Sequence, residues 1–189
     1  MRPPTPDAYF DEWWGRSDDP WAHATRWSEA RKYRLTAAAL PRPRYDRSFE
    51  PGCGIGVLTT LLAARSPDHL AMERHPRGVA ATRERCAGLP GVTVVEGRIP
   101  DDWPAGSFDL VVLSEVLYYL SSPELDAVLD RAVEALVPGG DLVAVHHRPS
   151  VDEHTWTGDE VHERLRAHPG LTSLSRLVEE GFVLDVLQR

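Results

Sequence analysis

The sequence predicts an α/β protein with a doubly wound, mostly parallel sheet of seven strands. Short apolar segments alternate with helical segments between residues 46 and 146, which is the pattern of a parallel sheet with helices on both faces. A glycine loop, Gly52 to Gly56, directly follows the first apolar segment, and the chain ends in two β-like segments separated by a turn. We therefore expect a single domain, residues 1–189, with an N-terminal helical lid (1–44) and an α/β core (45–189).

The N-terminal region carries one strong helix signal. Residues 1–8 are rich in proline and are expected to fray. Asp19 followed by Pro20 fits an N-cap with proline at the first helical position. The stretch E-A-R-K-Y-R-L-T-A-A-A-L, within residues 28–40, is strongly helical and is followed by two prolines that stop it.

The core elements follow from local patterns taken in order. The run F-D-L-V-V-L-S-E-V is apolar enough to be a central strand buried on both faces. The sequence T-W-T-G-D-E contains a capping box at Thr157 that starts the last helix, and the final segments form an antiparallel hairpin. Strands are predicted at 46–51, 69–74, 92–96, 108–116, 142–146, 171–178 and 182–187, and helices at 57–65, 76–87, 122–136 and from 157 onward.

Composition and charge narrow the possible partners. The net charge is -8, with 21 basic against 29 acidic residues, so nucleic acid and anionic membranes are unfavourable partners. We expect no signal peptide, because the N-terminal residues lack an apolar run, and no stretch approaches the roughly 20 apolar residues that a membrane helix needs. Cys53 and Cys86 are too few for a disulfide framework. No metal-ligand spacing occurs, because the adjacent His146 and His147 would leave opposite faces of a strand. We expect a cytoplasmic protein without a metal, acting as a monomer or homodimer.

The glycine loop distinguishes two classes of nucleotide cofactor. A dinucleotide loop reads G-x-G-x-x-G/A, but the third small position is here the branched Val57. The sequence instead has Gly52, Gly54 and Gly56 on alternate positions after Glu50. This arrangement resembles class I methyltransferases that use S-adenosylmethionine (SAM), in which the loop lies against the amino-acid tail of the cofactor.

Later segments support the same resemblance. Glu73 ends the second predicted strand, 23 residues after Glu50, where a carboxylate can accept both ribose hydroxyls, although nicotinamide enzymes place an acid similarly. The segments F-D-L-V-V-L-S-E-V-L-Y-Y-L and V-P-G-G-D-L-V resemble the corresponding part of SAM methyltransferases, and dehydrogenases do not share them as a set.

The chain is also similar to a narrower family, the NodS-like N-methyltransferases of nodulation-factor synthesis. The resemblance covers roughly residues 18–145 and is carried by D-D-P-W, W-S-E-A-R-K-Y, E-P-G-C-G-I-G-V-L-T and S-E-V-L-Y-Y-L, in that order. It implies a Rossmann-like fold and transfer of a methyl group to an amino-sugar nitrogen, with S-adenosylhomocysteine (SAH) as the other product. By position, the resemblance implies that SAM is bound by Gly52, Gly54, Gly56, Glu73, Arg98 and Ile99. Further candidates for the cofactor site are Glu50, Cys53, Arg74 and Ser114, with Trp21 and Arg31 from the N-terminal region.

One position departs from the family pattern. Arg98 stands where related enzymes usually have an aspartate that accepts from the adenine amino group. Either Asp101 or Asp102 substitutes for it, or only the backbone at Ile99 reads the base.

Methylation of an amine requires a neutral nitrogen, because the lone pair must attack the methyl group. Simple alkyl amines have a pKa near that of lysine, about 10.4, so a base or a site of low polarity is useful. The groups at the ends of the fourth and fifth strands are placed for that task, and at most one of the two adjacent tyrosines is expected to face the pocket. The candidate catalytic residues are Glu115, Tyr118, Tyr119, His146 and His147.

The aromatic N-terminal region is a candidate lid and acceptor wall. Trp13, Trp14, Trp21 and Trp27 crowd into 15 residues outside the core. A helix folded over the cofactor would exclude water, and flat aromatic faces suit the apolar face of a sugar ring. Of this region, the residues expected to reach the site are Trp21, Arg31 and Tyr33.

The leading hypothesis is methyl transfer from SAM to a small-molecule acceptor, most simply an amino sugar. The cofactor half of the sequence does not identify the acceptor atom, so an O-methyltransferase acting on a hydroxyl or carboxylate is an alternative. A SAM-binding protein without catalysis is a second alternative. A nicotinamide enzyme fits poorly, given Val57 and the later segments.

Overall fold

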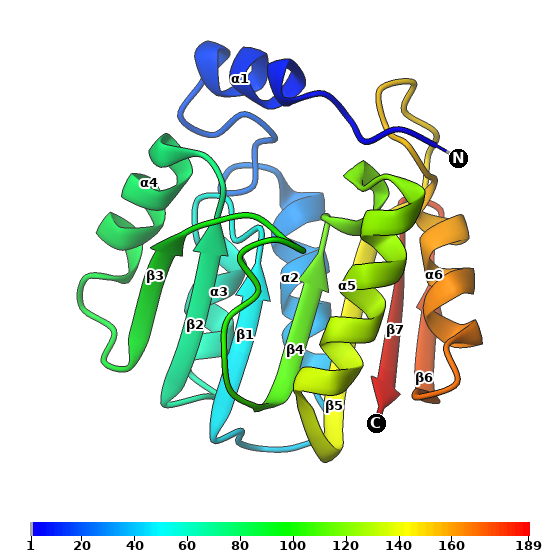
Figure 1. The fold of residues 1–189 in the computed structure, drawn as a ribbon. Helices are drawn as coiled ribbons and strands as arrows, with labels where there is room; N and C mark the ends of the chain where they lie inside the picture. The colour runs from blue at the N-terminus through cyan, green and yellow to red at the C-terminus, as the bar shows by residue number, and fades with distance from the viewer. Residues whose placement is uncertain (1) are drawn as a thin grey trace.

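The computed structural model describes residues 2–189, which form one mixed sheet with helices packed around it (Figure 1). The strands are β1 (Arg47–Pro51), β2 (Asp68–Glu73), β3 (Val92–Glu96), β4 (Phe108–Ser114), β5 (Leu136–His147), β6 (Thr172–Val178) and β7 (Phe182–Gln188). The helices are α1 (Asp7–Arg16), α2 (Trp27–Ala39), α3 (Val57–Ala63), α4 (Pro76–Cys86), the short 3-10 helix η1 (Leu117–Tyr119), α5 (Ser122–Ala135) and α6 (Gly158–Ala167).

The sheet has the strand order β3-β2-β1-β4-β5-β7-β6. Strands β1 to β5 are parallel, and β7 runs antiparallel to both of its neighbours, β5 and β6. Because β1 pairs with both β2 and β4, the strand order reverses between β1 and β4, which is where open α/β sheets bind ligands. The predicted fold class, with its parallel sheet and antiparallel C-terminal hairpin, is confirmed.

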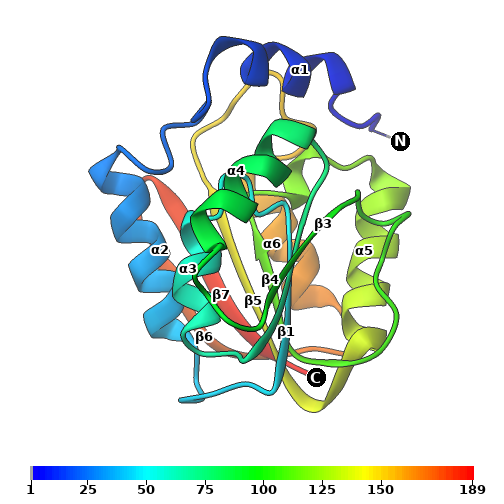
Figure 2. The same ribbon diagram turned by 90° about the vertical axis from the view of Figure 1, so that its left-hand side faces the viewer.

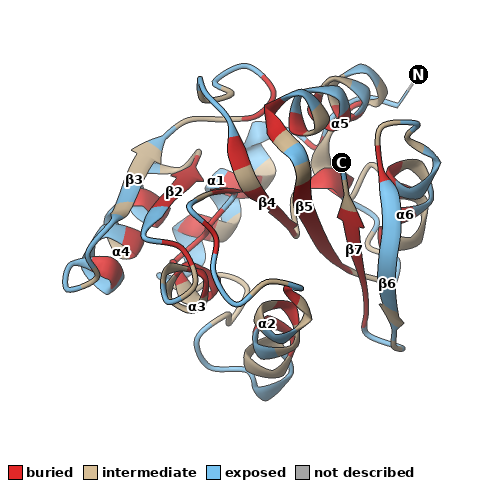
Figure 3. Cartoon of the chain, turned by 90° about the horizontal axis from the view of Figure 1, so that it is seen from below, coloured by how far each residue is buried: buried red, intermediate tan, exposed pale blue. Residues whose placement is uncertain are grey.

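Helices cover both faces of the sheet (Figure 2). Seen from below in Figure 3, α2 and α3 lie on one side of the strands, and α5 and α6 lie on the other. The side chains of β4 alternate between the two cores: Val111 belongs to the cluster that includes α5, and Val112 belongs to the cluster that includes α2 and α3. Both valines are fully buried, as the apolar run of this strand predicts.

Two helices start at the capping boxes that their sequences contain. The Ser121 side chain accepts from the Glu124 N–H, and the Glu124 carboxylate accepts from the Ser121 N–H, at the start of α5. Thr157 and Glu160 form the same reciprocal pair at α6, so the predicted helix start at Thr157 is confirmed.

The N-terminal region differs from the prediction. Residues 1–8 were expected to fray, but Thr5 is buried, its N–H donates to the Tyr119 carbonyl at 2.8 Å, and α1 begins at Asp7. Residue 1 lies outside the described residues. Asp19 caps a turn rather than a helix, since its carboxylate accepts from the His23 N–H at 2.7 Å and the chain does not become helical until Trp27. For residues 2–8, the long-range contact of Thr5 with Tyr119 overrides a local composition that is rich in proline.

The connection between α5 and β5 also differs. The helix was expected to continue to Leu136, and the strand to begin near Leu142, but the helix ends at Ala135 and β5 already starts at Leu136. Leu136 pairs with Phe108, so the V-P-G-G segment that follows it belongs to the strand. The register between β4 and β5 shifts between Phe108 and Leu110.

Helix α1 lies across the edge of the sheet at which β1 to β5 end (top of Figure 1). Its buried Phe10 and Trp14 pack in a cluster with Ile55 of the glycine loop. Among residues 2–189, no helix is both long enough and apolar enough to cross a bilayer.

Candidate active site

The three glycines of the loop are required by the conformation and by the surrounding protein. All three have a positive φ, +74° at Gly52, +60° at Gly54 and +78° at Gly56, which side chains rarely adopt. A Cβ on Gly52 would lie 2.2 Å from Val116 Cγ1, and one on Gly56 would lie 2.9 Å from Thr82 Cγ2. Gly56 is the N-cap of α3, so the loop turns directly into the helix N-terminus.

Glu73 holds the glycine loop from the end of β2. Its carboxylate accepts from the Gly54 N–H at 3.0 Å and from the His75 N–H at 2.9 Å. The side chain is buried, and burial raises the pKa of Glu73 in spite of these hydrogen bonds. Because each carboxylate oxygen can accept more than one hydrogen bond, both remain able to accept from ligand hydroxyls.

A cavity of about 340 Å³ opens above these residues. It runs along the ends of the strands, from Gly52 and Glu73 to Tyr118 and His154, and Phe10 and other residues of α1 line part of it. The volume lies within the range of small-molecule sites, and the position matches the switch point of the sheet.

The cavity brings together most of the residues that the sequence assigns to the site. Those that line it are Trp21, Gly52, Gly54, Glu73, Arg74, Arg98, Ile99, Glu115, Tyr118, Tyr119 and His147. The expectation that at most one of the two tyrosines faces the pocket is wrong, because both line it. Four others lie beside it or beneath the loop: Glu50, Cys53 and Ser114 line a small adjoining void, and Gly56 caps α3.

Two residues that were expected to reach the site, Arg31 and Tyr33, do not line the cavity. The Arg31 guanidinium binds the Glu179 carboxylate at 2.6 and 2.8 Å, in the turn between β6 and β7, and does not line the cavity. Tyr33 is buried and borders only the small void. Of the N-terminal tryptophans, Trp27 is 70% exposed, whereas Trp13, Trp14 and Trp21 line the cavity.

Arg74, after β2, and Arg98, after β3, connect this edge of the sheet to α1. The Asp7 carboxylate in the first turn of α1 lies 2.6 Å from Arg74 Nη2 and 3.6 Å from Arg98 Nη1. The Arg74 guanidinium also lies 4.3 Å from the centre of the Phe10 ring. The Asp102 carboxylate accepts from the Arg98 N–H at 2.9 Å, outside the cavity lining. Ile99, which lines the cavity, is the better placed of the two alternatives for contact with a base.

A buried ion pair lies at the centre of the cavity wall. Lys32, the only lysine in the sequence, places its Nζ 2.5 Å from Glu115 and 2.8 Å from Glu29. Glu115 also accepts from the Tyr118 hydroxyl and from the His147 N–H, and its backbone has φ +57°. Burial alone would raise the pKa of Glu115, but Lys32 and the hydrogen bonds outweigh it and lower the pKa to about 2.

Lys32, Glu29 and His23 also line the cavity, and the sequence reasoning missed all three. A single lysine in a chain with many arginines was a signal that could have pointed to Lys32. No signal in the sequence pointed to His23, because its position depends on the fold. The centre of its ring lies 5.7 Å from that of Trp21 and 5.9 Å from that of Tyr33.

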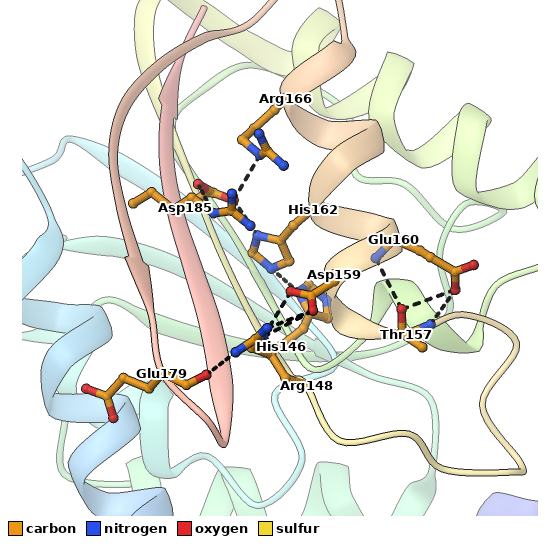
Figure 4. Close-up of polar contacts among 10 residues, drawn as sticks. His146, Arg148, Thr157, Asp159, Glu160, His162, Arg166, Glu179 and Asp185 are labelled. Atoms are coloured by element: carbon orange, nitrogen blue, oxygen red, sulfur yellow. Dashed lines mark hydrogen bonds and ion pairs between the residues drawn. The ribbon is translucent and has the colours of Figure 1, made fainter.

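His146 lies behind the cavity wall, in a buried polar chain (Figure 4). The Leu117 N–H donates to His146 Nε2 at 3.2 Å, so Nδ1 carries the proton of the neutral ring and donates to His162 Nε2 at 3.0 Å. His162 Nδ1 then donates to the Asp185 carboxylate at 2.7 Å, and Arg166 and Arg176 lie 3.7 Å from that carboxylate. Burial lowers the pKa of His146, which keeps it neutral. Of the adjacent histidines, only His147 lines the cavity.

No metal site is evident in the described part of the chain, where no three His, Cys, Asp or Glu side chains cluster as ligands.

The charge of Glu115 predicts a pH dependence of stability. In the unfolded chain Glu115 takes up a proton near its usual pKa of 4.5, whereas the folded protein keeps it ionised down to about 2. We therefore expect the Glu115 contribution to be complete above pH 4.5 and to be lost as the pH falls toward 2. Urea unfolding at a series of pH values should show a shallower loss of stability in Glu115→Gln than in the wild type. The exposed Glu84→Gln should behave as the wild type, and equal slopes in all three proteins would contradict the prediction.

Comparison with known proteins places this geometry in a family. A family model described as a methyltransferase domain matches residues 49–140. A crystal structure from Pseudomonas syringae that is assigned to the methyltransferases is 40% identical in sequence. It has a TM-score of 0.77, with 87% of this chain and 100% of that chain covered.

Proteins named for nodulation are similar as well. Nodulation protein S of Bradyrhizobium diazoefficiens is 30% identical over 131 residues, which cover 67% of this chain and 61% of the relative. The matched region covers between 54% and 61% of the length of three curated relatives that are named nodulation protein S. The N-methyltransferase NodS from Bradyrhizobium japonicum, in complex with SAH, has a TM-score of 0.86 at 23% identity, with 96% of each chain covered, and shares the fold. The chain therefore belongs to the class I SAM-dependent methyltransferase family, and within it is similar to the NodS proteins.

Proposed function

We propose that this protein transfers a methyl group from SAM to the amine nitrogen of an amino sugar or a related small metabolite. The observation that carries the proposal is one continuous cavity, which joins the glycine loop and Glu73 to an aromatic chamber at the ends of β4 and β5. The first part suits the cofactor, and the second suits a small acceptor.

The residues at the glycine loop fit SAM. A buried carboxylate that faces the cavity and accepts only from backbone N–H groups, as Glu73 does, suits the two hydroxyls of a ribose. The positive φ of Gly52 and Gly54 exposes backbone groups to a ligand at the start of α3. We assign the adenine end to Ile99 and Arg98, which line the cavity beyond Glu73. When bound, SAM supplies a methyl group that is already activated by its sulfonium.

The acceptor end favours a small molecule with flat or apolar faces. Tyr9, Trp13, Tyr118 and Tyr119 line it and offer aromatic surfaces on which the apolar face of a sugar ring can pack. Its carboxylates are already occupied, Glu115 by Lys32 and Glu124 by the N-cap of α5. Burial among these aromatic rings disfavours an ammonium ion, so the amine is held in its neutral, nucleophilic form. The likeness to NodS supports nitrogen as the methylated atom.

The N-terminal region completes the proposed site as a lid. Phe10 and Trp14 of α1 are buried against the glycine loop, and Trp21 stacks against Trp13 at 6.2 Å between ring centres. With α1 in place, water is kept from the reacting groups, which strengthens the electrostatic interactions inside the cavity.

The acceptor assay tests the proposal directly. Purified protein with SAM should add one methyl group to a free amino sugar, detected by mass spectrometry, and none to its N-acetylated form. Methylation of hydroxyl or carboxylate compounds instead would replace the nitrogen proposal with an O-methyltransferase. SAH binding without a product from any acceptor would support a binding protein without catalysis.

Glu73 should control cofactor affinity. In Glu73→Gln, the hydrogen bonds from the ribose hydroxyls lose their charged acceptor, and each such bond contributes about 1.5–3 kcal/mol. We therefore expect SAH to bind about 10- to 100-fold more weakly, as measured by titration calorimetry. Glu96→Gln is the matched control, because Glu96 pairs in register with Glu73 but is exposed at the sheet edge. Unchanged SAH affinity in a folded Glu73→Gln protein would remove Glu73 from the cofactor site.

The lid is tested by truncation. A protein that lacks residues 1–27 keeps Glu29 and Lys32 but loses α1, and we expect its turnover to fall by more than about 10-fold, because the reacting groups become exposed to water. Circular dichroism establishes that the truncated protein is folded. Wild-type turnover in such a protein would show that α1 has no part in catalysis.

A further inference from the structure

His154 lies at the acceptor end of the cavity, in the segment between β5 and α6. Its imidazole stacks on the Tyr118 ring, with 4.1 Å between ring centres and an angle of 15°. The edges of two further rings face it, Tyr119 at 4.9 Å and Tyr9 at 6.4 Å. The four side chains thus form a chamber that holds the imidazole in one orientation.

The imidazole nitrogens of His154 remain available to a ligand. Within residues 2–189, neither ring nitrogen hydrogen-bonds to another side chain or to the backbone; only the main-chain N–H of His154 is engaged, by the Val151 carbonyl at 3.0 Å. The neighbouring polar groups are occupied, because the Tyr118 hydroxyl donates to Glu115, and Glu115 also binds Lys32. His154 therefore combines an open hydrogen-bonding capacity with a fixed ring.

The charge state of His154 also suits a proton acceptor. Burial among aromatic rings lowers the pKa of His154 to about 4, so the ring is neutral at pH 6–8 and keeps one nitrogen lone pair. The nearby Glu115 carboxylate acts in the opposite sense and favours the protonated ring. A proton that arrives on His154 during the reaction would thus form an imidazolium beside a fixed negative charge.

We propose that His154 is a catalytic residue that accepts the proton of the acceptor, held in a chamber formed with Tyr9, Tyr118 and Tyr119. The inference rests on the proposed methyl transfer. The acceptor nitrogen forms a bond to the methyl carbon as the carbon–sulfur bond breaks, and the electrons of that bond remain on sulfur. The burial that lowers the pKa of His154 disfavours the charged product ammonium ion as well. The extra proton on that nitrogen therefore passes to a ring nitrogen of His154 and later leaves to solvent.

Other groups near the chamber are less suited to this role. Glu115 already accepts from three partners, so little of its hydrogen-bonding capacity is left for an acceptor amine. His146 lies outside the cavity lining, with both ring nitrogens engaged. His147 lines the cavity but is not stacked in the chamber, and it is the competing candidate.

Substitution of His154 by a ring without nitrogens tests the proposal. His154→Phe retains stacking on Tyr118 but cannot accept a proton, and general-base catalysis contributes about 10²- to 10⁴-fold. We expect the kcat of His154→Phe to fall by at least about 100-fold, with SAH affinity within about twofold of the wild type. His154→Asn leaves space in the chamber, so added imidazole should restore part of its turnover. His147→Phe is made in parallel, and His168→Asn, in a side chain that binds Asp130 away from the cavity, serves as the control.

The outcomes separate the role of His154 from the proposed function. If His154→Phe keeps more than a third of wild-type turnover, or if only His147→Phe loses it, His154 is not the proton acceptor, and the methyltransferase proposal is unaffected. If wild-type protein binds SAH but methylates no acceptor, the proposed function is wrong, and the role of His154 is wrong with it. Loss of turnover in His154→Phe with rescue of His154→Asn by imidazole would establish the proposal.

Discussion

The geometry of the site depends on the buried contact between Lys32 of α2 and Glu115 at the end of β4. Removing charges from water is costly, so Glu115 depends on Lys32 to remain charged at this depth, and losing the lysine would leave an uncompensated charge. The pair fixes more than two side chains, because Glu115 also accepts from Tyr118 and from the N–H of His147. Helix α2, which lies outside the alternating α/β core, is thereby joined to the ends of two central strands.

The segment after β4 is held from both faces of the sheet. On one face, Lys32 binds Glu115, and on the other, the His146 ring accepts from the Leu117 N–H and is itself supported by His162 and Asp185. Short-range hydrogen bonds on both sides leave this segment little freedom. Such rigidity suits a wall that must align an acceptor with a methyl group, since orientation alone can supply on the order of 7–11 kcal/mol of a barrier.

The sequence predicted the core better than the region that covers it. The apolar run of β4, the glycine loop and the capping box at Thr157 are local signals, and the structure contains each of them. Residues 2–16 could not be predicted in this way, because α1 and the chain before it are ordered by contacts with residues more than 50 positions away, such as Asp7 with Arg74. His154 had no signal in the sequence for the same reason: its neighbours Tyr9, Tyr118 and Tyr119 come from two other parts of the chain.

The extended chain before α1 also has a consequence for the order of folding. Arg2 binds Glu160, and the Thr5 hydroxyl donates to the carbonyl of Glu153, so the covering of the cavity joins residues about 150 positions apart. Contacts of such high sequence separation require the closure of a very long loop, whose entropy must be overcome before the contacts can stabilise it. On the ribosome, the glycine loop and its strands are complete well before residue 160 emerges. The nascent chain can therefore form the glycine loop beneath the cavity early, whereas the contact between Arg2 and Glu160 that holds the N-terminal segment over the cavity forms only after residue 160 has been made.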